Sequence, residues 1–315
     1  MRIIGTGSAL PSFTLTNDML TGFLETSDEW IVSRTGIKQR QIITSEKLED
    51  LAAEAAIKAL ENANIKASDL DFIICSNVIN EYITPSISCI VQGKIGAKCP
   101  CIDINGACAG FIYALDIAQA YFQSGRVKNV LVVCAEEPTR MVDWKERDLC
   151  VLFGDGAGAL ILTGGDNCKA IKLSTLSKTE SLYQIRTLQP TPFINKEEID
   201  GPLVMKGKDV FKLAVVFSLK DIRSVLKIGN IAPEDVDYYL LHQANIRIVD
   251  TIRNNLGLDE SKFLHNIENH GNTSSASIPI LIDQMNKENK FKKGDKLVFS
   301  AFGAGFTTGA CLIYW

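Results

Sequence analysis

The sequence predicts an α/β protein built from two duplicated halves that form a five-layered α-β-α-β-α sandwich. Buried-strand patterns alternate with amphipathic helical stretches along the chain, and three segments recur in the same order in its two halves. Continuous apolar strands between helices are typical of mostly parallel sheets that are covered on both faces. We expect the first half at residues 1–164 and the second at residues 165–315.

The repeat is clearest where a turn leads into a buried strand. Three pairs of segments match: residues 64–75 with 230–241, 130–133 with 297–300, and 158–162 with 309–313. An amphipathic helix precedes the first segment of each half, at residues 51–63 and 210–226. Residues 171–207, with a proline-containing stretch at 189–193 and an acidic one at 197–200, read as an inserted excursion between the halves.

Composition excludes several classes of protein. With 46% hydrophobic and 22% charged residues, the chain is expected to fold throughout, and its net charge of −4 argues against a general nucleic-acid binder. The first residues lack an apolar run long enough for a signal peptide or a membrane span, which predicts a cytoplasmic protein that binds no membrane. The nine cysteines form neither a disulfide framework nor a metal motif, so we expect no metal.

Cys108 is the strongest candidate for a nucleophile. Residues 102–104 end a predicted strand, residues 105–107 form a tight turn, and Cys108 opens an apolar helix that continues to Tyr121. A cysteine at a helix N-terminus faces unpaired N–H groups and the positive end of the helix dipole, which predicts a lowered thiol pKa. Read without its context, a cysteine such as Cys108 is better explained as a small core residue, here beside Gly106 and Gly110.

His242 and Asn272 are the partners that the second half offers. His242 ends a repeated strand and Asn272 lies in a loop, both at positions where α/β proteins collect site residues. His265 and His270 are rivals, of which we read His270 as a local packing choice. The glycine-rich stretch 153–158 precedes a strand instead of following one, so we interpret it as a structural turn and not as a nucleotide-binding loop.

Six segments resemble motifs of the β-ketoacyl-[acyl-carrier-protein] synthase III family, which belongs to the thiolase-like superfamily. They occur in family order and span almost the whole chain, at residues 26–37, 103–111, 153–158, 242–245, 271–275 and 302–305. The resemblance implies a thiolase-like fold, a homodimer and an acyltransferase that starts fatty acid elongation. It implies no cofactor, because the coenzyme A thioester is a substrate.

The resemblance also assigns roles to individual residues. Cys108 accepts the acyl primer from acyl-coenzyme A, and His242 and Asn272 stabilise the enolate formed when malonyl-[acyl-carrier protein] loses CO₂. The oxyanion formed on the acylated cysteine is held by the backbone N–H groups of Cys108 and Gly303. The expected products are 3-oxoacyl-[acyl-carrier protein], CO₂ and coenzyme A.

Further positions match family residues that hold the substrates. Those expected to contact coenzyme A are Thr26, Trp30, Arg34, Arg147 and Asn245, with Trp30 and Arg147 sandwiching the adenine. Lys212 and Arg247 are expected to dock the acidic carrier protein. Thr84 stands where acetyl-preferring relatives carry a bulky aromatic residue, in a loop lining the partner subunit's acyl pocket, so we expect longer or branched primers to be accepted too.

Three other functions stay open at this point. A thiolase-like enzyme of secondary metabolism, or one forming hydroxymethylglutaryl groups, would use the same residues with a different acceptor. A cysteine hydrolase would also show the chain order Cys108, His242, Asn272. A noncatalytic acyl-binding homologue is the third alternative.

Overall fold

Two five-stranded sheets form the centre of the computed structural model, which describes residues 1–186, 192–193 and 201–315. The first sheet has the order β1 (Arg2–Ala9), β7 (Gly156–Thr163), β6 (Asn129–Glu136), β4 (Phe72–Ser76) and β5 (Cys101–Ile104). The second has the order β8 (Cys168–Thr175), β14 (Thr307–Tyr314), β13 (Lys296–Gly303), β11 (Tyr238–Leu241) and β12 (Phe263–Leu264). The two sheets therefore repeat one topology.

The sheets are mostly parallel, as predicted, because four of the five strands in each run in one direction and only β7 and β14 run against them. The strands β4, β5 and β6 are parallel to one another, as are β11, β12 and β13. The pairs β1 with β7, β6 with β7, β13 with β14, and β8 with β14 are antiparallel. Only three residues separate β13 from β14, and such a short connection can join antiparallel strands but not parallel ones.

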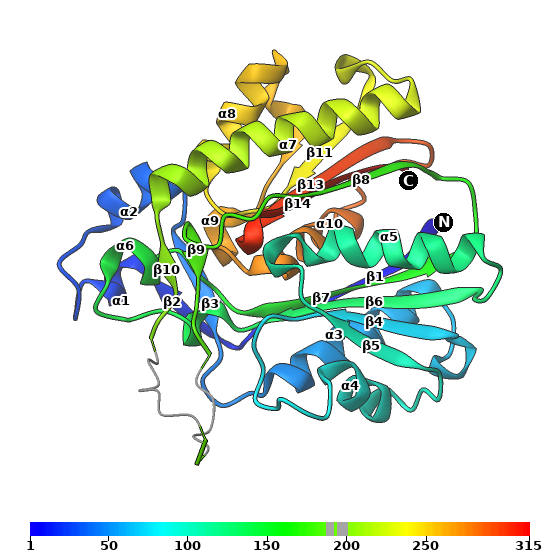
Figure 1. Ribbon diagram of the computed structural model, residues 1–315, viewed down its shortest axis with the longest axis horizontal. Coiled ribbons are helices and arrows are strands. Elements are labelled where there is room, and N and C mark those ends of the chain that lie inside the picture. The colour runs from blue at the N-terminus through cyan, green and yellow to red at the C-terminus, as the bar shows by residue number, and fades with distance from the viewer. Residues whose placement is uncertain (187–191, 194–200) are drawn as a thin grey trace.

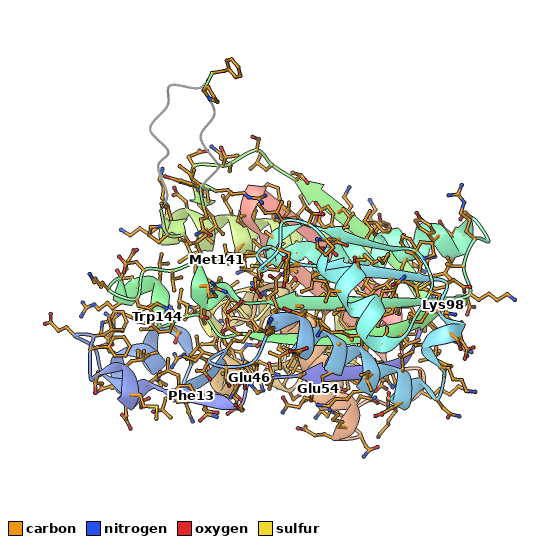
Figure 2. All side chains as sticks on the ribbon, turned by 90° about the horizontal axis from the view of Figure 1, so that it is seen from below. Phe13, Glu46, Glu54, Lys98, Met141 and Trp144 are labelled. Atoms are coloured by element: carbon orange, nitrogen blue, oxygen red, sulfur yellow. The ribbon has the colours of Figure 1, made fainter. Side chains whose placement is uncertain are left out.

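Helices complete the five layers (Figure 1). The outer layers are α3 (Leu48–Ala63) with α4 (Ile87–Ile95) on the first sheet, and α7 (Gly207–Gly229) with α8 (Ile246–Leu256) on the second. Between the sheets lie α5 (Gly110–Gln123) and α10 (Ser277–Lys287), packed in one apolar core with both inner faces. Figure 2 looks onto the outer layer of the first sheet, where Glu54 of α3 is labelled.

The matching segments occupy equivalent places in the two halves. Residues 64–75 end in β4 and residues 230–241 end in β11, the strands next to β6 and β13. The preceding helices α3 and α7 both stop at an asparagine in the left-handed conformation, Asn64 and Asn230, each with φ of 53°. The thiolase-like five-layered fold is thus present, whereas the division at residues 164 and 165 stays a prediction.

Smaller elements gather at one end of the two sheets. They are two antiparallel strand pairs and four short helices. The pairs are β2 (Phe13–Thr16) with β3 (Gln39–Ile42) and β9 (Leu182–Tyr183) with β10 (Val204–Met205), and the helices are α1 (Asn17–Leu20), α2 (Asp28–Thr35), α6 (Arg147–Cys150) and α9 (Ile267–His270). The excursion predicted at 171–207 begins too early, because residues 171–175 pair with β14 as part of β8. The stretches 189–193 and 197–200 lie largely or wholly outside the described residues.

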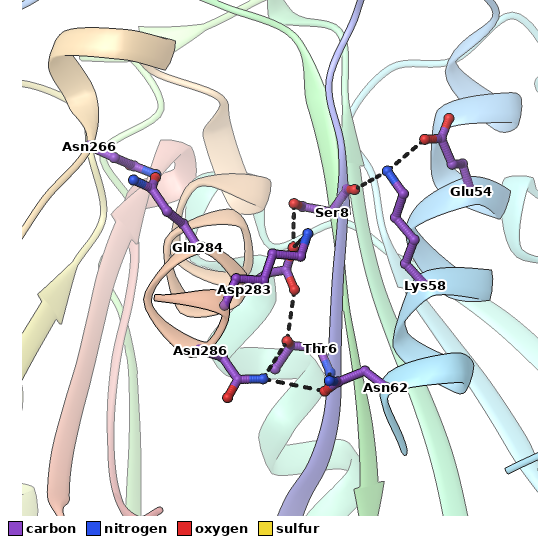
Figure 3. A network of polar contacts seen from close by, with 10 residues as sticks. Thr6, Ser8, Glu54, Lys58, Asn62, Asn266, Asp283, Gln284 and Asn286 are labelled. Carbon is purple, nitrogen blue, oxygen red and sulfur yellow. Dashed lines mark hydrogen bonds and ion pairs between the residues drawn. The ribbon is translucent and has the colours of Figure 1, made fainter. Parts of the chain in front are cut away.

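A buried polar network ties α10 to the first half (Figure 3). Asp283 is fully buried, and its carboxylate accepts hydrogen bonds from Thr6 Oγ1 at 2.7 Å and Ser8 Oγ at 2.5 Å. Lys287 Nζ lies 2.7 Å from the same carboxylate. Because the carboxylate is fully paired, it can be buried at the junction without a large desolvation cost, and it fixes the position of α10.

Among the residues that the structure describes, no helix is long and apolar enough to cross a lipid bilayer.

Candidate active site

The turn that carries Cys108 connects β5 to α5 through a short 3₁₀ helix at Ala107–Ala109. Ala107 has φ of 49°, a left-handed conformation that is uncommon outside glycine and is often found at functional sites. Its backbone nitrogen donates to Asn105 Oδ1 at 3.1 Å, which holds the turn. Cys108 Sγ accepts a hydrogen bond of 3.3 Å from the hydroxyl of Ser274, a residue of the other half.

Burial raises the pKa of the Cys108 thiol to about 12, although the Ser274 hydrogen bond opposes this shift. The predicted lowering of this pKa is therefore wrong in direction. The regular helix α5 begins only at Gly110, and the cost of burying a thiolate outweighs the favourable helix end. The resting thiol is protonated at neutral pH, so acylation needs a group that takes its proton.

His242 follows directly after β11 and is 2% exposed. Its Nδ1 lies 2.8 Å from Ser277 Oγ, and its ring meets Phe302 edge-on with centroids 5.2 Å apart. Ser277 Oγ also accepts from the Gln243 backbone nitrogen at 3.3 Å, so its own hydrogen is free to point at Nδ1. This arrangement favours the tautomer with the proton on Nε2, which makes Nε2 a hydrogen-bond donor.

Burial lowers the pKa of His242 to about 3, so the imidazole is neutral at physiological pH. A neutral imidazole donates a hydrogen bond without bringing a charge into the site.

Asn272 is held by the glycine-rich stretch 153–158. Its backbone nitrogen donates to Leu152 O at 2.8 Å, and the Gly154 nitrogen donates to its carbonyl oxygen at 3.2 Å. The side-chain oxygen accepts from the Ser274 nitrogen at 2.9 Å, which leaves the amide NH₂ as the free end. The stretch therefore acts as the structural turn that the sequence predicted, with Asp155 bonded to Thr139.

Gly303 brings the end of β13 against the nucleophile turn. A Cβ atom at this position would lie 2.5 Å from Cys108 N and 2.8 Å from Ala107 Cβ. Gly303 is required by this close approach and not by its backbone angles, since its φ of −160° is accessible to any residue. The carboxyl ends of β5 and β13 thus meet at Cys108.

A cavity of about 560 Å³ lies beside this site, lined by Asn272 but by neither Cys108 nor His242. Trp30 and Arg34 line its outer part, and Asn272 and Phe302 line its inner part. Two guanidinium groups lie near the Trp30 ring, with Cζ of Arg34 at 4.5 Å and Cζ of Arg147 at 4.9 Å from its centroid. A planar base could enter between Trp30 and Arg147 only after the two side chains separate.

Asn245 and Thr26, the two other residues predicted to contact coenzyme A, differ in their position relative to this cavity. Asn245 lines it, but its side chain is already bonded to the backbone of Arg34 and Arg247. Thr26 is not among the lining residues, and its hydroxyl is buried without a hydrogen-bond partner in the described chain. Their contacts with coenzyme A therefore stay predictions.

The predicted docking and gate residues are on the surface. Arg247 lines the cavity with its Cζ 6.0 Å from the Phe211 ring centroid, and Lys212 is exposed on α7. Thr84 is exposed and does not line the cavity of this chain.

The two rival histidines have other partners. Nδ1 of His270 lies 2.8 Å from Gln41 Oε1, and Nδ1 of His265 lies 3.1 Å from Glu268 Oε2. Neither contact involves Cys108, His242 or Asn272. Among the described residues, no group of three or more His, Cys, Asp or Glu side chains is placed to hold a metal ion.

Sequence reasoning missed the residues that support the site. Ser274 and Ser277 bond to Cys108 and His242, and Glu136 lies beneath them as a buried carboxyl group. The motif at 271–275 contained one signal, a run of hydroxyl residues beside Asn272. Glu136 gave none, because only the folded chain brings the end of β6 beside that run.

Two duplicated halves with a half-buried cysteine at the turn between them define the thiolase-like class of enzymes. Comparison with known families narrows this class. Residues 102–179 match the family model for 3-oxoacyl-[acyl-carrier-protein] synthase III, and residues 226–315 match the model for its C-terminal part. Residues 21–140 also match the model for stage V sporulation protein AD.

Individual relatives cover the whole chain. The β-ketoacyl-[acyl-carrier-protein] synthase III of Clostridium acetobutylicum is 43% identical over 320 residues, covering 100% of this chain and 98% of its own. The crystal structure of 3-oxoacyl-[acyl-carrier-protein] synthase III from Aquifex aeolicus is 41% identical with a TM-score of 0.93, and the alignment covers 100% of this chain and 99% of that one. The priming β-ketosynthase of the R1128 polyketide pathway has a TM-score of 0.93 at 31% identity, covering 99% of this chain and 95% of its own.

The chain belongs to the β-ketoacyl-[acyl-carrier-protein] synthase III family. It is accordingly an acyl-transferring condensing enzyme of fatty acid biosynthesis.

Proposed function

We propose that this enzyme joins an acyl-coenzyme A primer to malonyl-[acyl-carrier protein] by decarboxylative Claisen condensation. The acyl group is carried on Cys108 as a thioester, and the products are 3-oxoacyl-[acyl-carrier protein], CO₂ and coenzyme A. The strongest support is that Ser274 links the nucleophile to the predicted enolate donor. Its hydroxyl hydrogen-bonds to Cys108, and its backbone nitrogen hydrogen-bonds to the Asn272 side chain.

In the first half-reaction the Cys108 sulfur attacks the thioester carbonyl of the primer. The carbonyl oxygen becomes an oxyanion, which the backbone N–H groups of Cys108 and Gly303 stabilise in this proposal. The close packing of these two residues supports a preformed pair of donors, and one such donor is typically worth 10²–10³ in rate, or about 2.7–4 kcal/mol.

In the second half-reaction the malonyl group loses CO₂ and leaves an enolate. His242 Nε2–H and the Asn272 amide donate hydrogen bonds to the enolate oxygen, and the carbanion attacks the acyl group on Cys108. The neutral state of His242 and the fixed Asn272 oxygen support donor roles for both side chains. Because the donors are placed before the reaction, little reorganisation is needed as charge develops.

The cavity supports a path for the primer. We infer that the adenine of coenzyme A stacks at Trp30 with Arg34 and Arg147 near it, and that the pantetheine arm runs inward past Asn245 and Thr26. Arg247, which lines the cavity, and Lys212, which is exposed on α7, would steer the acidic carrier protein, an effect that weakens with salt.

A homodimer remains part of the proposal. The strand β5 is an unpaired edge of its sheet in the single chain, and Ile102 on it is 46% exposed. Ile83, one residue before Thr84, is 79% exposed. An apolar open edge favours pairing with a second copy. Thr84 would then border the partner's acyl pocket and admit longer primers.

A cytoplasmic location and the lack of a cofactor likewise stay predictions.

Hydrolysis by a cysteine protease mechanism fits the site poorly. Such enzymes use an asparagine oxygen to orient the histidine. Here His242 Nδ1 is already hydrogen-bonded to Ser277 Oγ, and the Asn272 side-chain oxygen accepts from the Ser274 nitrogen, so Asn272 does not orient the histidine.

The test is a separate assay of each half-reaction with purified carrier protein. His242→Ala and Asn272→Ala should still gain an acyl group from acyl-coenzyme A, while CO₂ release from malonyl-[acyl-carrier protein] falls at least about 100-fold. Loss of acylation with CO₂ release preserved would reverse the assignment. Turnover with malonyl- or acetoacetyl-coenzyme A in place of the carrier-bound substrate would favour an enzyme of secondary metabolism or of hydroxymethylglutaryl formation.

A further inference from the structure

Glu136 is a buried carboxyl group that the reaction described so far does not use. It ends β6 and is 1% exposed. Oε1 accepts a hydrogen bond of 2.5 Å from Ser275 Oγ, and Oε2 accepts one of 3.2 Å from the Val78 nitrogen. In the described chain, the groups that stabilise its charge are hydroxyl and N–H donors rather than a cation. A buried carboxyl without a cation is costly, which makes it a candidate for a role in the site.

A single hydroxyl connects this carboxyl to the nucleophile. Ser274 Oγ lies 3.3 Å from Cys108 Sγ, and the same hydroxyl lowers the pKa of Glu136, against the raising effect of burial. A serine hydroxyl has one hydrogen, so when that hydrogen points at the carboxylate the thiol can donate its own to Ser274 Oγ. Ser274 has φ of 52°, an unusual conformation for serine, and its nitrogen is fixed by Asn272 Oδ1 at 2.9 Å. The loop therefore holds the hydroxyl between sulfur and carboxylate at some cost in backbone strain.

The neighbouring residue offers a natural comparison. Ser275 also bonds to Glu136, and it accepts from Ser76 Oγ at 2.9 Å, but its hydrogen bonds do not include Cys108. Both adjacent serines thus interact with the Glu136 carboxylate, but only Ser274 also contacts the Cys108 sulfur.

The protonation states around Glu136 suit a proton acceptor. The titratable groups that face it are the thiols of Cys75 on β4, Cys134 on β6 and Cys108, and burial raises the pKa of each, so all three stay protonated at neutral pH. Burial also raises the pKa of Glu136, to about 7. Glu136 is the member of this group that changes charge near neutral pH, where a general base works best.

We propose that Glu136 stores the Cys108 proton during the catalytic cycle, receiving it through the Ser274 hydroxyl. This inference rests on the proposed function. As the sulfur bonds to the primer carbon, the thiol proton moves to Ser274 Oγ, and the Ser274 proton moves to Glu136. The bond from carbon to the coenzyme A sulfur breaks, and that thiolate takes a proton from water.

Condensation returns the stored proton. When the carbanion attacks the acyl group, the bond from carbon to Cys108 sulfur breaks and a thiolate is released inside the site. Glu136 gives its proton back through Ser274, which restores the thiol and the carboxylate together. Ser274 touches the reacting sulfur, whereas Glu136 acts only through Ser274.

The experiment measures single-turnover acylation by acyl-coenzyme A between pH 5.5 and 9, followed by intact mass, in wild type, Ser274→Ala and Ser275→Ala. The wild-type rate should rise with pH through an inflection near 7, the pKa of Glu136. Ser274→Ala should acylate at least about 10-fold more slowly and lose the inflection. Ser275→Ala should keep the inflection, moved to higher pH because the carboxylate has lost a hydrogen-bond donor.

Two Glu136 variants extend the comparison. Glu136→Gln should behave as Ser274→Ala does, and Glu136→Asp should recover part of the rate with a shifted inflection. An inflection retained in Ser274→Ala, or equal effects of the two serine variants, would overturn the proposal even if Glu136→Gln fails to fold.

Alkylation of Cys108 by iodoacetamide, read from the mass of its peptide, supplies a measurement independent of the substrate. Its pH profile in wild type should show the same inflection, and Ser274→Ala should abolish it. If no acyl-coenzyme A acylates the wild type, the proposed function fails, while the alkylation profile still decides between storage at Glu136 and a structural role.

Discussion

Gly303 and Cys108 pack so closely that a Cβ atom on residue 303 would lie 2.5 Å from the Cys108 backbone nitrogen. The two residues come from different sheets, at the end of β13 and just after β5. Since a real Cβ cannot approach a backbone atom this closely, the contact allows only glycine and fixes the nucleophile turn against the second half.

Gly303→Ala should therefore lower the acylation rate by at least about 100-fold, because the added methyl group displaces the turn and one oxyanion donor. Gly164→Ala is the matched control, since a Cβ there meets nothing within 4 Å. Single-turnover acylation by acyl-coenzyme A compares the two variants. Equal rates in both would show that the close contact does not position the nucleophile.

Arg147→Ala should weaken binding of acyl-coenzyme A more than it slows the chemistry. The guanidinium lies 4.9 Å from the Trp30 centroid, and a cation–π contact is worth about 0.5–2 kcal/mol. We expect KM for acyl-coenzyme A to rise roughly 3- to 30-fold with kcat little changed. Arg126→Ala, at an exposed position after α5, serves as the control. A fall in kcat with unchanged KM would place Arg147 in the chemical step instead.

His242 predicts a specific dependence of stability on pH. Its pKa is about 3 in the folded protein against 6.5 in the unfolded chain, so between pH 6.5 and pH 3 the unfolded state binds the proton and the folded state does not. Stability from this residue is complete above pH 6.5 and is lost as the pH falls toward 3. By pH 4.5 the loss should reach about 2–3 kcal/mol.

Urea denaturation of wild type and His242→Gln at pH 7.5, 5.5 and 4.5 measures this effect. The difference between their unfolding free energies should change in favour of the variant as the pH falls, while the shared carboxyl groups cancel. Parallel pH profiles would mean that His242 is not buried in its neutral form.

Substitution of Asp283 measures how much the junction between α10 and the first half contributes to stability. Asp283→Ala leaves the buried Thr6 hydroxyl and the half-buried Ser8 hydroxyl without this acceptor and should lower the unfolding free energy by about 3 kcal/mol. Lys287→Ala removes a partner whose side chain is 59% exposed and should cost less than about 1 kcal/mol. Thermal denaturation of both variants distinguishes them, and similar losses would contradict a dominant role for the hydroxyl contacts.

Much of the architecture could be predicted from local patterns. The repeated turn and strand at Asn64 and Asn230 predicted two equivalent halves, because the same apolar pattern requires the same burial in each. The reversed direction of β7 and β14 was less accessible, since a run of apolar residues reads alike in parallel and antiparallel pairs.

The chemistry of the site was only partly predictable. The turn before Cys108 indicated a nucleophile, but the direction of its pKa depends on how deeply the turn is buried, which local sequence does not specify. Ser274 and Glu136 are far apart in the chain, and their contact exists only once η6 (Ser274–Ala276) packs beside β6. Contacts of this kind arise from tertiary structure and leave no periodic signal.

In the proposed reaction Cys108 carries the acyl group. Intact-mass analysis after incubation with a panel of acyl-coenzyme A primers tests it, with Cys108→Ala and Cys150→Ala compared with wild type and the adduct located by peptide mapping. Wild type and Cys150→Ala should gain one acyl group on the Cys108 peptide, and Cys108→Ala should gain none. An equal adduct on Cys108→Ala, or no adduct on wild type with any primer, would contradict the account.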